Sequence, residues 1–202
     1  MDLDAPATVA LEQAVATLRD GHLVIYPTET LYAIGGRGLD PAAAARTRRA
    51  KGREDGKPLP LIAADLDQAR TLCATWPDAA ARLAARFWPG PLTLVLPADG
   101  DVPSEVVAGG DTIAVRVPGR ALPRLLCRAV GPVISTSANR SGDPPATRCA
   151  DAVAAVGSWV ELALDGGVCA GAASTIVDLT AGAPRVLREG AIARADVLTV
   201  LG

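Results

Sequence analysis

The sequence has few of the side chains on which metal and thiol chemistry depend. It contains a single histidine, His22, and four cysteines that lie far apart with no CxxC spacing. A closed zinc site needs four Cys or His ligands, and a Ser or Cys hydrolase needs a histidine beside its nucleophile. The sequence therefore argues against both classes, and no side-chain metal site is expected. We expect the cysteines to be small buried residues with free thiols.

Aromatic residues and long apolar runs are also scarce. Aromatics make up 3% of a chain that is 50% hydrophobic, so the core must consist of Ala, Val and Leu. No run of about 18 apolar residues marks a membrane span. The N-terminal stretch MDLDAPATVALEQ is acidic where a signal peptide begins with basic residues. These absences predict a cytoplasmic protein that does not enter a membrane.

Neither sign of charge dominates the sequence. Lys and Arg number 20 against 22 Asp and Glu, which gives a net charge of −2. Nucleic-acid-binding domains usually carry an excess of positive charge. Any site for an anion must therefore be a local cluster of cations.

What the sequence does contain is an alternation of helix and strand patterns over 202 residues, which favours one domain. Helices are expected over 8–20, from Pro41 to just before Lys51, over 66–88 (as one or two helices), 120–130 and 148–156. Strands are expected over 23–26, 59–63, 92–96, 112–117, 132–134, 160–164 and 174–178, with a further strand around Arg188. Pro27 is expected to end regular pairing, and Gly35, Gly36 and Gly38 to form a flexible turn. The alternation predicts a mixed α/β sheet covered by helices.

Short polar stretches lie at the ends of several predicted strands, where ligands sit in open α/β sheets. Thr28, Glu29 and Thr30 follow the first strand, the sequence STSANRSG follows strand 132–134, and Ser174 opens a later strand. Ordinary polar turns and helix caps have the same composition, so a purely structural role stays open. The alternative is a site where hydroxyls and backbone N–H groups bind a carboxylate or phosphate.

Two further features supply local positive charge. The loop Lys51-Gly52-Arg53-Glu54-Asp55-Gly56-Lys57-Pro58 combines glycines with ammonium and guanidinium groups that suit an anion. It is not a Walker A loop, because its glycine spacing is one residue short and Pro58 replaces the Ser or Thr that binds magnesium. A solvated loop is the alternative. Arg116 lies inside a strand and faces away from Val115 and Val117. The strand has an apolar setting, which favours an anion partner for Arg116 over an outward, solvated side chain.

Together these clusters offer cations and hydroxyls but no obvious general base or nucleophile. No GxSxG sequence marks a nucleophilic serine. A reaction that needs only positioning and charge neutralisation suits such a set, as phosphoryl or nucleotidyl transfer does.

Seven motifs occur in the order found in one protein family. They are PTETLY at 27–32, Lys51-Gly52-Arg53 with Lys57-Pro58-Leu59, Trp88-Pro89-Gly90-Pro91-Leu92-Thr93, Ala114-Val115-Arg116-Val117-Pro118, Ser135-Thr136-Ser137-Ala138-Asn139, Ser174-Thr175-Ile176 and Leu187-Arg188. From about residue 8 to 192 the sequence resembles the YrdC/Sua5 family, in its short, TsaC-type form. The resemblance implies a single YrdC-like domain over 1–202, without the C-terminal domain of longer members. It also implies a twisted mixed β-sheet flanked by helices, with a concave basic cleft.

The resemblance further implies an enzyme, an L-threonylcarbamoyladenylate synthase. Such an enzyme converts L-threonine, bicarbonate and ATP into threonylcarbamoyl-AMP, pyrophosphate and water. The product serves N6-threonylcarbamoylation of adenosine 37 in tRNA, through hand-over to the tRNA threonylcarbamoyl transferase complex. Binding of tRNA or double-stranded RNA is left open. Mg2+ is expected to accompany the triphosphate, with Glu29 as a weak candidate ligand.

The resemblance also implies roles for individual residues. Lys51 and Arg53 would be the catalytic residues and would bind the ATP phosphates. Further ATP-binding roles fall to Lys57, Thr112, Ser137, Asn139 and Arg188, with a loop residue near Thr147. Arg116 would bind the threonine carboxylate, with Thr28, Thr30, Ser135 and Ser174 around the amino acid. The carbamate formed on threonine would itself attack the α-phosphate, so the protein need not supply a nucleophile.

Three positions depart from the family pattern, and two other functions remain open. Ala33 replaces a common Gly, Glu54 stands where Pro commonly follows the basic triplet, and Ile62 occupies the place of a His in archaeal relatives. One alternative is an RNA-binding module without catalysis, which the net charge of −2 argues against. The other is a YciO-like paralogue of the same fold. The intact PTET, KGR and SAN signatures favour the synthase.

Overall fold

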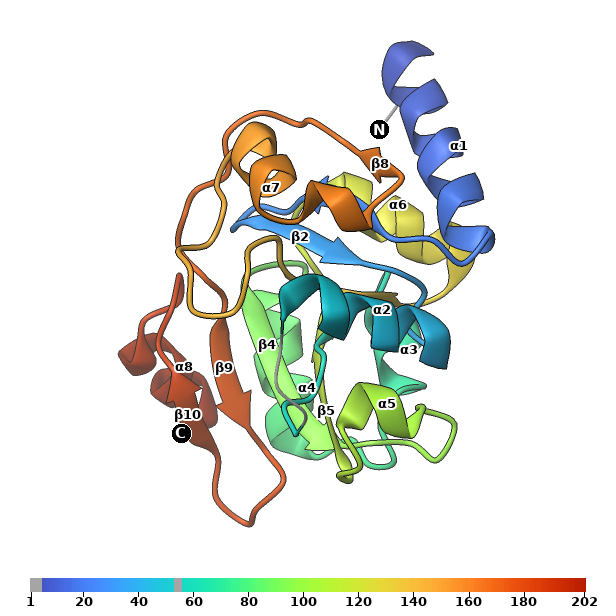
Figure 1. Ribbon diagram of the computed structural model, residues 1–202. Coiled ribbons are helices and arrows are strands. Elements are labelled where there is room, and N and C mark those ends of the chain that lie inside the picture. Colours follow the sequence, from blue (N-terminus) through green and yellow to red (C-terminus); the bar gives the residue numbers. More distant parts are fainter. Residues whose placement is uncertain (1–4, 53–55) are drawn as a thin grey trace.

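The computed structural model describes residues 5–52 and 56–202 (Figure 1). The helices are α1 (Ala5–Arg19), α2 (Pro41–Lys51), α3 (Leu66–Arg70), α4 (Asp78–Phe87), α5 (Ser104–Val107), α6 (Ala121–Val130), α7 (Cys149–Val156) and α8 (Arg194–Leu201), with a 3-10 helix η1 (Gly157–Trp159). The strands are β1 (Val24–Pro27), β2 (Tyr32–Gly35), β3 (Leu61–Ile62), β4 (Leu92–Pro97), β5 (Thr112–Arg116), β6 (Val133–Ile134), β7 (Thr136–Ser137), β8 (Leu162–Ala163), β9 (Thr175–Asp178) and β10 (Arg185–Arg188).

The strands form two sheets, whereas the sequence had suggested one. The four-stranded sheet has the order β7-β2-β1-β8, and the six-stranded sheet has the order β10-β9-β4-β5-β3-β6. Both are mixed: β1 is antiparallel to β2 but parallel to β8, and β4 is antiparallel to β5 but parallel to β9. In Figure 1, β2 lies in the upper half with α6 and α7, while β4, β5 and β9 lie below it. The predicted mixed α/β fold is confirmed, with its strands divided between two sheets.

The segment 133–137 belongs to both sheets, because β6 pairs with β3 and β7 pairs with β2. At this crossing a Cβ atom on Gly35 would lie 1.8 Å from the carbonyl oxygen of Ile134. The backbone N–H of Ile134 also donates to the carbonyl of Gly36 at 2.9 Å. Gly35 therefore permits a close approach of two backbones. The flexible turn predicted at this position is wrong, since Gly35 is the last residue of β2.

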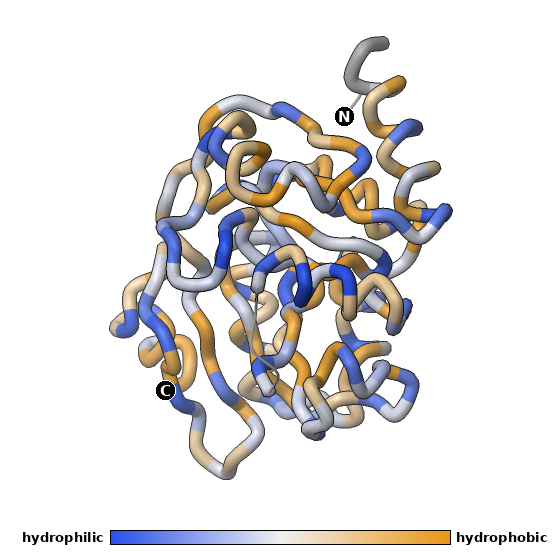
Figure 2. Tube along the Cα trace, in the orientation of Figure 1, coloured by the Kyte–Doolittle hydropathy of each residue, from blue (hydrophilic) through white to orange (hydrophobic). Residues whose placement is uncertain are grey.

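Most of the core consists of aliphatic side chains, as the low aromatic content predicts, but Tyr26 and Tyr32 are also fully buried. The larger buried cluster includes Leu61 and Leu94 from the six-stranded sheet, and the smaller one includes Leu18 of α1 and Leu126 of α6. Figure 2 shows helices in which hydrophobic and hydrophilic residues alternate along the chain. That pattern is typical of helices that bury one face against a sheet and expose the other.

Helix α2 fixes the position of Lys51, its last residue. The carboxylate of Asp40 accepts a hydrogen bond from the N–H of Ala42 at 2.8 Å, and Pro41 occupies the first turn. Gly52 ends the helix in the left-handed conformation, with φ of +55°. Lys51 is therefore carried on a regular helix, although the sequence had placed it in a basic loop.

Five elements were missed by the sequence patterns: β2, α5, β7, α8 and the 3-10 helix η1. Strand β2 begins at Tyr32 and pairs with β1 along its whole length, with Pro27 opposite Tyr32. Pro27 is itself still paired, but it is the last residue of β1, so regular pairing ends there as expected. A proline is tolerated there because only alternate residues of an antiparallel strand donate to a given neighbour.

Within the two described ranges, no helix is long and apolar enough to cross a membrane. No group of three or more His, Cys, Asp or Glu side chains in these ranges is arranged to hold a metal ion. The four cysteines are free thiols, and only Cys149 is not fully buried. Burial raises the pKa of the Cys73 thiol to about 12, so this thiol stays protonated at neutral pH.

Candidate functional site

A cavity of about 540 Å³ is lined by residues of both sheets. The four-stranded sheet contributes the turn between β1 and β2 together with β7, and the six-stranded sheet contributes residues of β3, β4, β5, β9 and β10. The end of α2 and the loop 139–145 complete the lining. This volume is typical of small-molecule sites. The cavity therefore collects polar stretches that lie far apart in the sequence.

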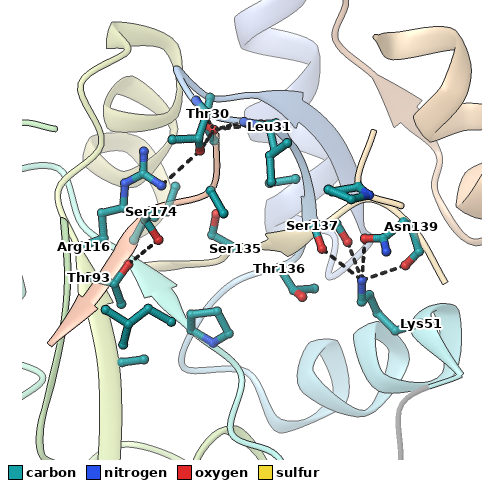
Figure 3. Close-up of a pocket in the computed structure, with 18 of the residues that line it drawn as sticks. Thr30, Leu31, Lys51, Thr93, Arg116, Ser135, Thr136, Ser137, Asn139 and Ser174 are labelled. Carbon is teal, nitrogen blue, oxygen red and sulfur yellow. Dashed lines mark hydrogen bonds between the residues drawn. The ribbon is translucent and has the colours of Figure 1, made fainter. Parts of the chain in front are cut away.

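Most of the predicted site residues line this cavity, namely Thr28, Thr30, Lys51, Lys57, Arg116, Ser135, Ser137, Asn139, Ser174 and Arg188. Arg53 lies outside the described residues. Figure 3 shows two separate groups of side chains in the cavity. Arg116, Thr30, Thr93 and Ser174 form one group, which we call the arginine end; Lys51, Ser137 and Asn139 form the other, which we call the lysine end.

At the arginine end, the guanidinium of Arg116 is held on several sides. Its Nε donates to the carbonyl of Gly90 at 3.0 Å, and its Nη1 donates to Thr30 Oγ1 at 3.2 Å. Its Nη2 forms an ion pair with the carboxylate of Glu29. The Thr30 hydroxyl also lies 2.9 Å from that of Thr28. Arg116 is buried, so its side chain is not the outward, solvated one that was the alternative in the sequence analysis.

Glu29 is fixed by backbone groups as well as by Arg116. Its Oε1 accepts from the N–H of Gly119 at 2.8 Å, and its Oε2 lies 3.5 Å from the N–H of Arg120. Burial alone raises the pKa of Glu29, but Arg116 and the Gly119 N–H together outweigh burial and hold the pKa below its ordinary value. The carboxylate is therefore ionised at neutral pH.

Ser174 connects the arginine end to Arg188. The Ser174 hydroxyl lies 2.9 Å from the Thr93 hydroxyl, and the Ser174 carbonyl accepts from Arg188 Nε at 3.0 Å and Nη2 at 2.8 Å. Burial and the positive charge of Arg116 lower the pKa of the Arg188 guanidinium. Two guanidinium groups thus lie close enough to repel each other, which favours binding of an anion near them.

At the lysine end, a loop wraps around the ammonium group of Lys51. The Nζ atom donates to the carbonyls of Ser137 at 2.6 Å and Asn139 at 2.7 Å, and lies 3.0 Å from Asn139 Oδ1 and 3.3 Å from Ser137 Oγ. The Asn139 side-chain amide donates in turn to the carbonyls of Arg140 and Asp143. Lys51 is buried in spite of its charge, because the loop supplies these oxygen atoms.

Thr112 is not among the residues that line the cavity, and its predicted place beside ATP stays a prediction. Thr112 is the first residue of β5 and pairs with Pro97, whereas Arg116 is the last residue of the same strand. A strand rises about 3.3 Å per residue, so these two side chains are about 13 Å apart along it. The loop residue Thr147 does not line the cavity either.

Several lining residues were not predicted from the sequence, among them Thr93 and Tyr32. Thr93 is a polar residue inside the apolar strand Leu92–Pro97. A polar side chain in an apolar strand is the same pattern that indicated Arg116. Tyr32 lines the cavity while its hydroxyl donates to Asp165 Oδ1 at 3.0 Å and to the carbonyl of Gly167 at 2.7 Å. No signal in the sequence links Tyr32 to residues more than 130 positions away.

Two of the three departures from the family pattern also lie in this lining. Ala33 and Ile62 both line the cavity and are almost fully buried. Glu54 lies outside the described residues. The methyl group of Ala33 and the side chain of Ile62 therefore make part of the wall apolar.

The described lining does not form a metal site of its own. Asp143 is the acidic residue among the described lining residues, and it is exposed. Glu29 is engaged by Arg116 and Gly119, so it is not available as a ligand without breaking those contacts. Mg2+ usually binds through one or two carboxylates together with substrate phosphates. Asp143 and the lining hydroxyls fit such an ion only as minor partners of a nucleotide that brings it.

The fold and the cavity define an α/β protein with two buried cationic side chains, Arg116 and Lys51, in one cavity. The sequence model of the Sua5/YciO/YrdC family, described as "Telomere recombination", matches residues 16–190. The curated "Threonylcarbamoyl-AMP synthase" of Chromohalobacter salexigens is 42% identical over 174 residues, which are 85% of this chain and 94% of that protein. The chain belongs to the Sua5/YciO/YrdC family.

Other relatives in this family are longer. The "Threonylcarbamoyl-AMP synthase" of Pyrococcus abyssi is 39% identical over 191 residues, which are 94% of this chain but 56% of that protein. The crystal structure of P. abyssi Sua5 complexed with L-threonine matches with a TM-score of 0.92 and 38% identity, and the match covers 95% of this chain and 57% of that chain. The chain therefore spans little more than half the length of these matches. The TM-score confirms the predicted mixed α/β fold.

Proposed function

We propose that the protein is an L-threonylcarbamoyladenylate synthase, a nucleotidyltransferase that joins the AMP part of ATP to a carbamate formed on L-threonine. The observation that carries the proposal is the presence of two cationic anchors, Arg116 and Lys51, at separate places in one cavity. The names of the C. salexigens and P. abyssi relatives and the threonine complex of P. abyssi Sua5 support it.

In this proposal the arginine end binds threonine. Arg116 binds the threonine carboxylate, and a guanidinium–carboxylate pair fixes orientation as well as position. Thr28, Thr30, Ser135 and Ser174 surround the rest of the amino acid through their hydroxyls. Ala33 and Ile62 form a buried apolar part of the cavity wall.

The lysine end binds ATP in the same proposal. Lys51 and Arg53 are the catalytic cations and neutralise the phosphates, with Lys57 and Arg188 as further cations and Ser137 and Asn139 as polar partners. Mg2+ accompanies the triphosphate and neutralises charge on it when bound. No described cluster of carboxylates holds that ion by itself, so the protein's own contribution is its ammonium and guanidinium groups.

The reaction needs no nucleophile from the protein. The threonine nitrogen and bicarbonate form a carbamate with loss of water, and a carbamate oxygen attacks the α-phosphorus of ATP. A new P–O bond forms as the bond to the departing pyrophosphate breaks. Catalysis then rests on holding the carbamate in line with the α-phosphate and on neutralising charge. That requirement matches a cavity rich in hydroxyls and cations.

The proposal extends to the fate of the product. Threonylcarbamoyl-AMP is an activated carbamoyl donor that hydrolyses in water, so it suits direct transfer to a partner. We propose that a tRNA threonylcarbamoyl transferase complex in the cytoplasm receives it for modification of adenosine 37. Direct contact of this chain with tRNA or double-stranded RNA is a weaker part of the proposal, because the net charge is −2.

A pyrophosphate-release assay tests the proposed function. Purified protein with ATP and Mg2+ should release pyrophosphate only when both L-threonine and bicarbonate are present, and L-serine should replace threonine poorly. Loss of the signal on omission of either substrate distinguishes the synthase from an ATPase. Absence of pyrophosphate, together with salt-sensitive RNA binding, would instead favour the RNA-binding module. Absence of both would favour a YciO-like paralogue with another activity.

A further inference from the structure

The Glu29 carboxylate lies behind Arg116 and outside the cavity lining. It comes from the turn between β1 and β2 of the four-stranded sheet, whereas Arg116 ends β5 of the six-stranded sheet. The ion pair therefore joins the two sheets across the edge of the cavity. Only 10% of the Arg116 side chain and 25% of the Glu29 side chain are exposed, so water screens this pair weakly.

The contacts of Arg116 leave a defined set of donors for a ligand. A guanidinium has five N–H groups in a planar fork. Its neighbours Gly90, Thr30 and Glu29 accept one bond each, from Nε, Nη1 and Nη2 respectively. One N–H on each Nη atom remains, and two such groups match the two oxygens of a carboxylate.

Glu29 itself has little freedom to move. Its Oε1 accepts from both Arg116 and the Gly119 N–H, and a Cβ atom added to Gly119 would lie 3.3 Å from the same oxygen. The close packing of backbone and carboxylate fixes the Glu29 side chain. A fixed carboxylate in turn fixes the rotation of the guanidinium, since it holds one Nη atom while Gly90 holds Nε.

We propose that Glu29 is a positioning residue that holds Arg116 in the rotamer in which its two remaining N–H groups face the carboxylate of threonine. The inference rests on the proposed function, because it assumes that Arg116 binds threonine. Glu29 touches neither substrate in this proposal. Its contribution is to prevent the guanidinium from turning toward Arg188 or solvent before threonine arrives.

Replacement of Glu29 by Gln tests the inference, since glutamine keeps the shape and one acceptor but removes the charge. We expect the Kd for threonine from calorimetry, and the KM for threonine, to rise about tenfold to a hundredfold, the range for a hydrogen bond to a charged group. The KM for ATP and the kcat at saturating threonine should stay within twofold. Glu161→Gln is the matched control, because Glu161 forms an exposed ion pair with His22.

The same substitution in a second background separates positioning from general destabilisation. In an Arg116→Gln protein, Glu29→Gln should add no further loss of threonine affinity, because the guanidinium it orients is gone. An undiminished loss in that background would overturn the inference, as would equal losses for threonine and ATP. Should Glu29→Gln fail to fold, Glu29→Asp is the second variant, because it keeps the charge on a shorter side chain. Its loss of threonine affinity should be intermediate.

Wild-type protein separates failure of the inference from failure of the proposed function. A wild type that binds threonine, with a Glu29→Gln protein that binds it equally well, overturns only the role of Glu29. A wild type that neither binds threonine nor releases pyrophosphate contradicts both proposals.

Discussion

The two ends of the cavity hold their cations in different ways. Arg116 is paired with an ionised carboxylate from the other sheet, so its charge is balanced before any ligand binds. Lys51 is held by carbonyl, amide and hydroxyl oxygens of one loop. Both side chains are buried; the contacts of Arg116 include a full opposite charge, and those of Lys51 include the dipoles of these oxygen atoms.

This difference indicates different behaviour on ligand binding. At the arginine end, two N–H groups remain for a ligand, so a carboxylate can bind without disturbing existing contacts. At the lysine end, the three N–H groups of the ammonium face four oxygen atoms within 3.3 Å. A phosphate must therefore replace at least one loop contact. We expect threonine to find a preformed site, and ATP to require rearrangement of the loop 137–143.

The largest effect is expected from Lys51→Met, which removes the charge and leaves the loop oxygens without their donor. Each buried acceptor that loses its partner costs about 1–3 kcal/mol. We therefore expect kcat/KM for ATP to fall about a thousandfold, with a much smaller change in threonine Kd, measured by pyrophosphate release and calorimetry.

Arg49→Met is the control for this variant, because Arg49 is an exposed cation on the same helix. Thermal unfolding of both variants shows whether the effect is local. Equal losses of threonine and ATP affinity in Lys51→Met would remove the distinction between the two ends.

The next largest effect is expected from Arg116→Ala, which removes the guanidinium group and leaves the Glu29 carboxylate buried without its partner. Loss of charged hydrogen bonds of this kind corresponds to about 2–3 kcal/mol, or roughly a hundredfold in the KM for threonine. The KM for ATP should change little. Arg185→Ala breaks the Arg185–Asp178 pair, in which the arginine is 65% exposed, and should leave both constants unchanged. A larger effect on ATP than on threonine would contradict the assignment of the ends.

A smaller effect concerns pH and stability. The pKa of Glu29 is lower in the folded protein than in the unfolded chain, so its ion pair stabilises the fold fully above the unfolded pKa, near 4.5. That contribution disappears as the pH falls through the lower folded-state value. The difference in unfolding free energy between wild type and Glu29→Gln should therefore be largest near pH 6 and should shrink in acid. Urea titrations at several pH values measure it, and a constant difference would argue against the ion pair.

The smallest effect is expected from Thr112→Val. Thr112 lies at the far end of β5, and threonine and valine have nearly the same shape. The KM for ATP and for threonine should both stay within twofold of wild type. A selective rise in the KM for ATP would instead support the predicted place of Thr112 beside ATP. The ATP site would then extend well beyond the described cavity.

The sequence was a good guide where structure depends on neighbours along the chain. Asp40 and Pro41 mark the start of α2 through local capping, and the structure confirms the helix they predict. Polar stretches after strands indicated most of the lining. The division into two sheets was not predicted, because strand pairing is decided by residues distant in sequence. For the same reason β2 was missed, and Gly35, its last residue, was expected in a flexible turn.

The candidate site was predictable in composition but not in its internal contacts. Arg116 was singled out as a cation inside an apolar strand, yet nothing in the sequence paired it with Glu29, 87 residues away. Thr93 was not predicted, although it too is a polar residue inside an apolar strand. Lys51 was expected to reach an anion from a basic loop, and only the structure shows that Ser137 and Asn139 already surround it.

The contact between Gly35 and the Ile134 carbonyl bears on how the cavity can change over evolution. At that point the two sheets are separated by main-chain atoms alone, so no exchange of side chains can widen or narrow their spacing. Ser135 and Ser137 follow within three residues and take their places relative to both sheets from this contact. Substitutions such as Ala33 or Ile62 can then reshape the wall of the cavity, while its width at this junction stays the same.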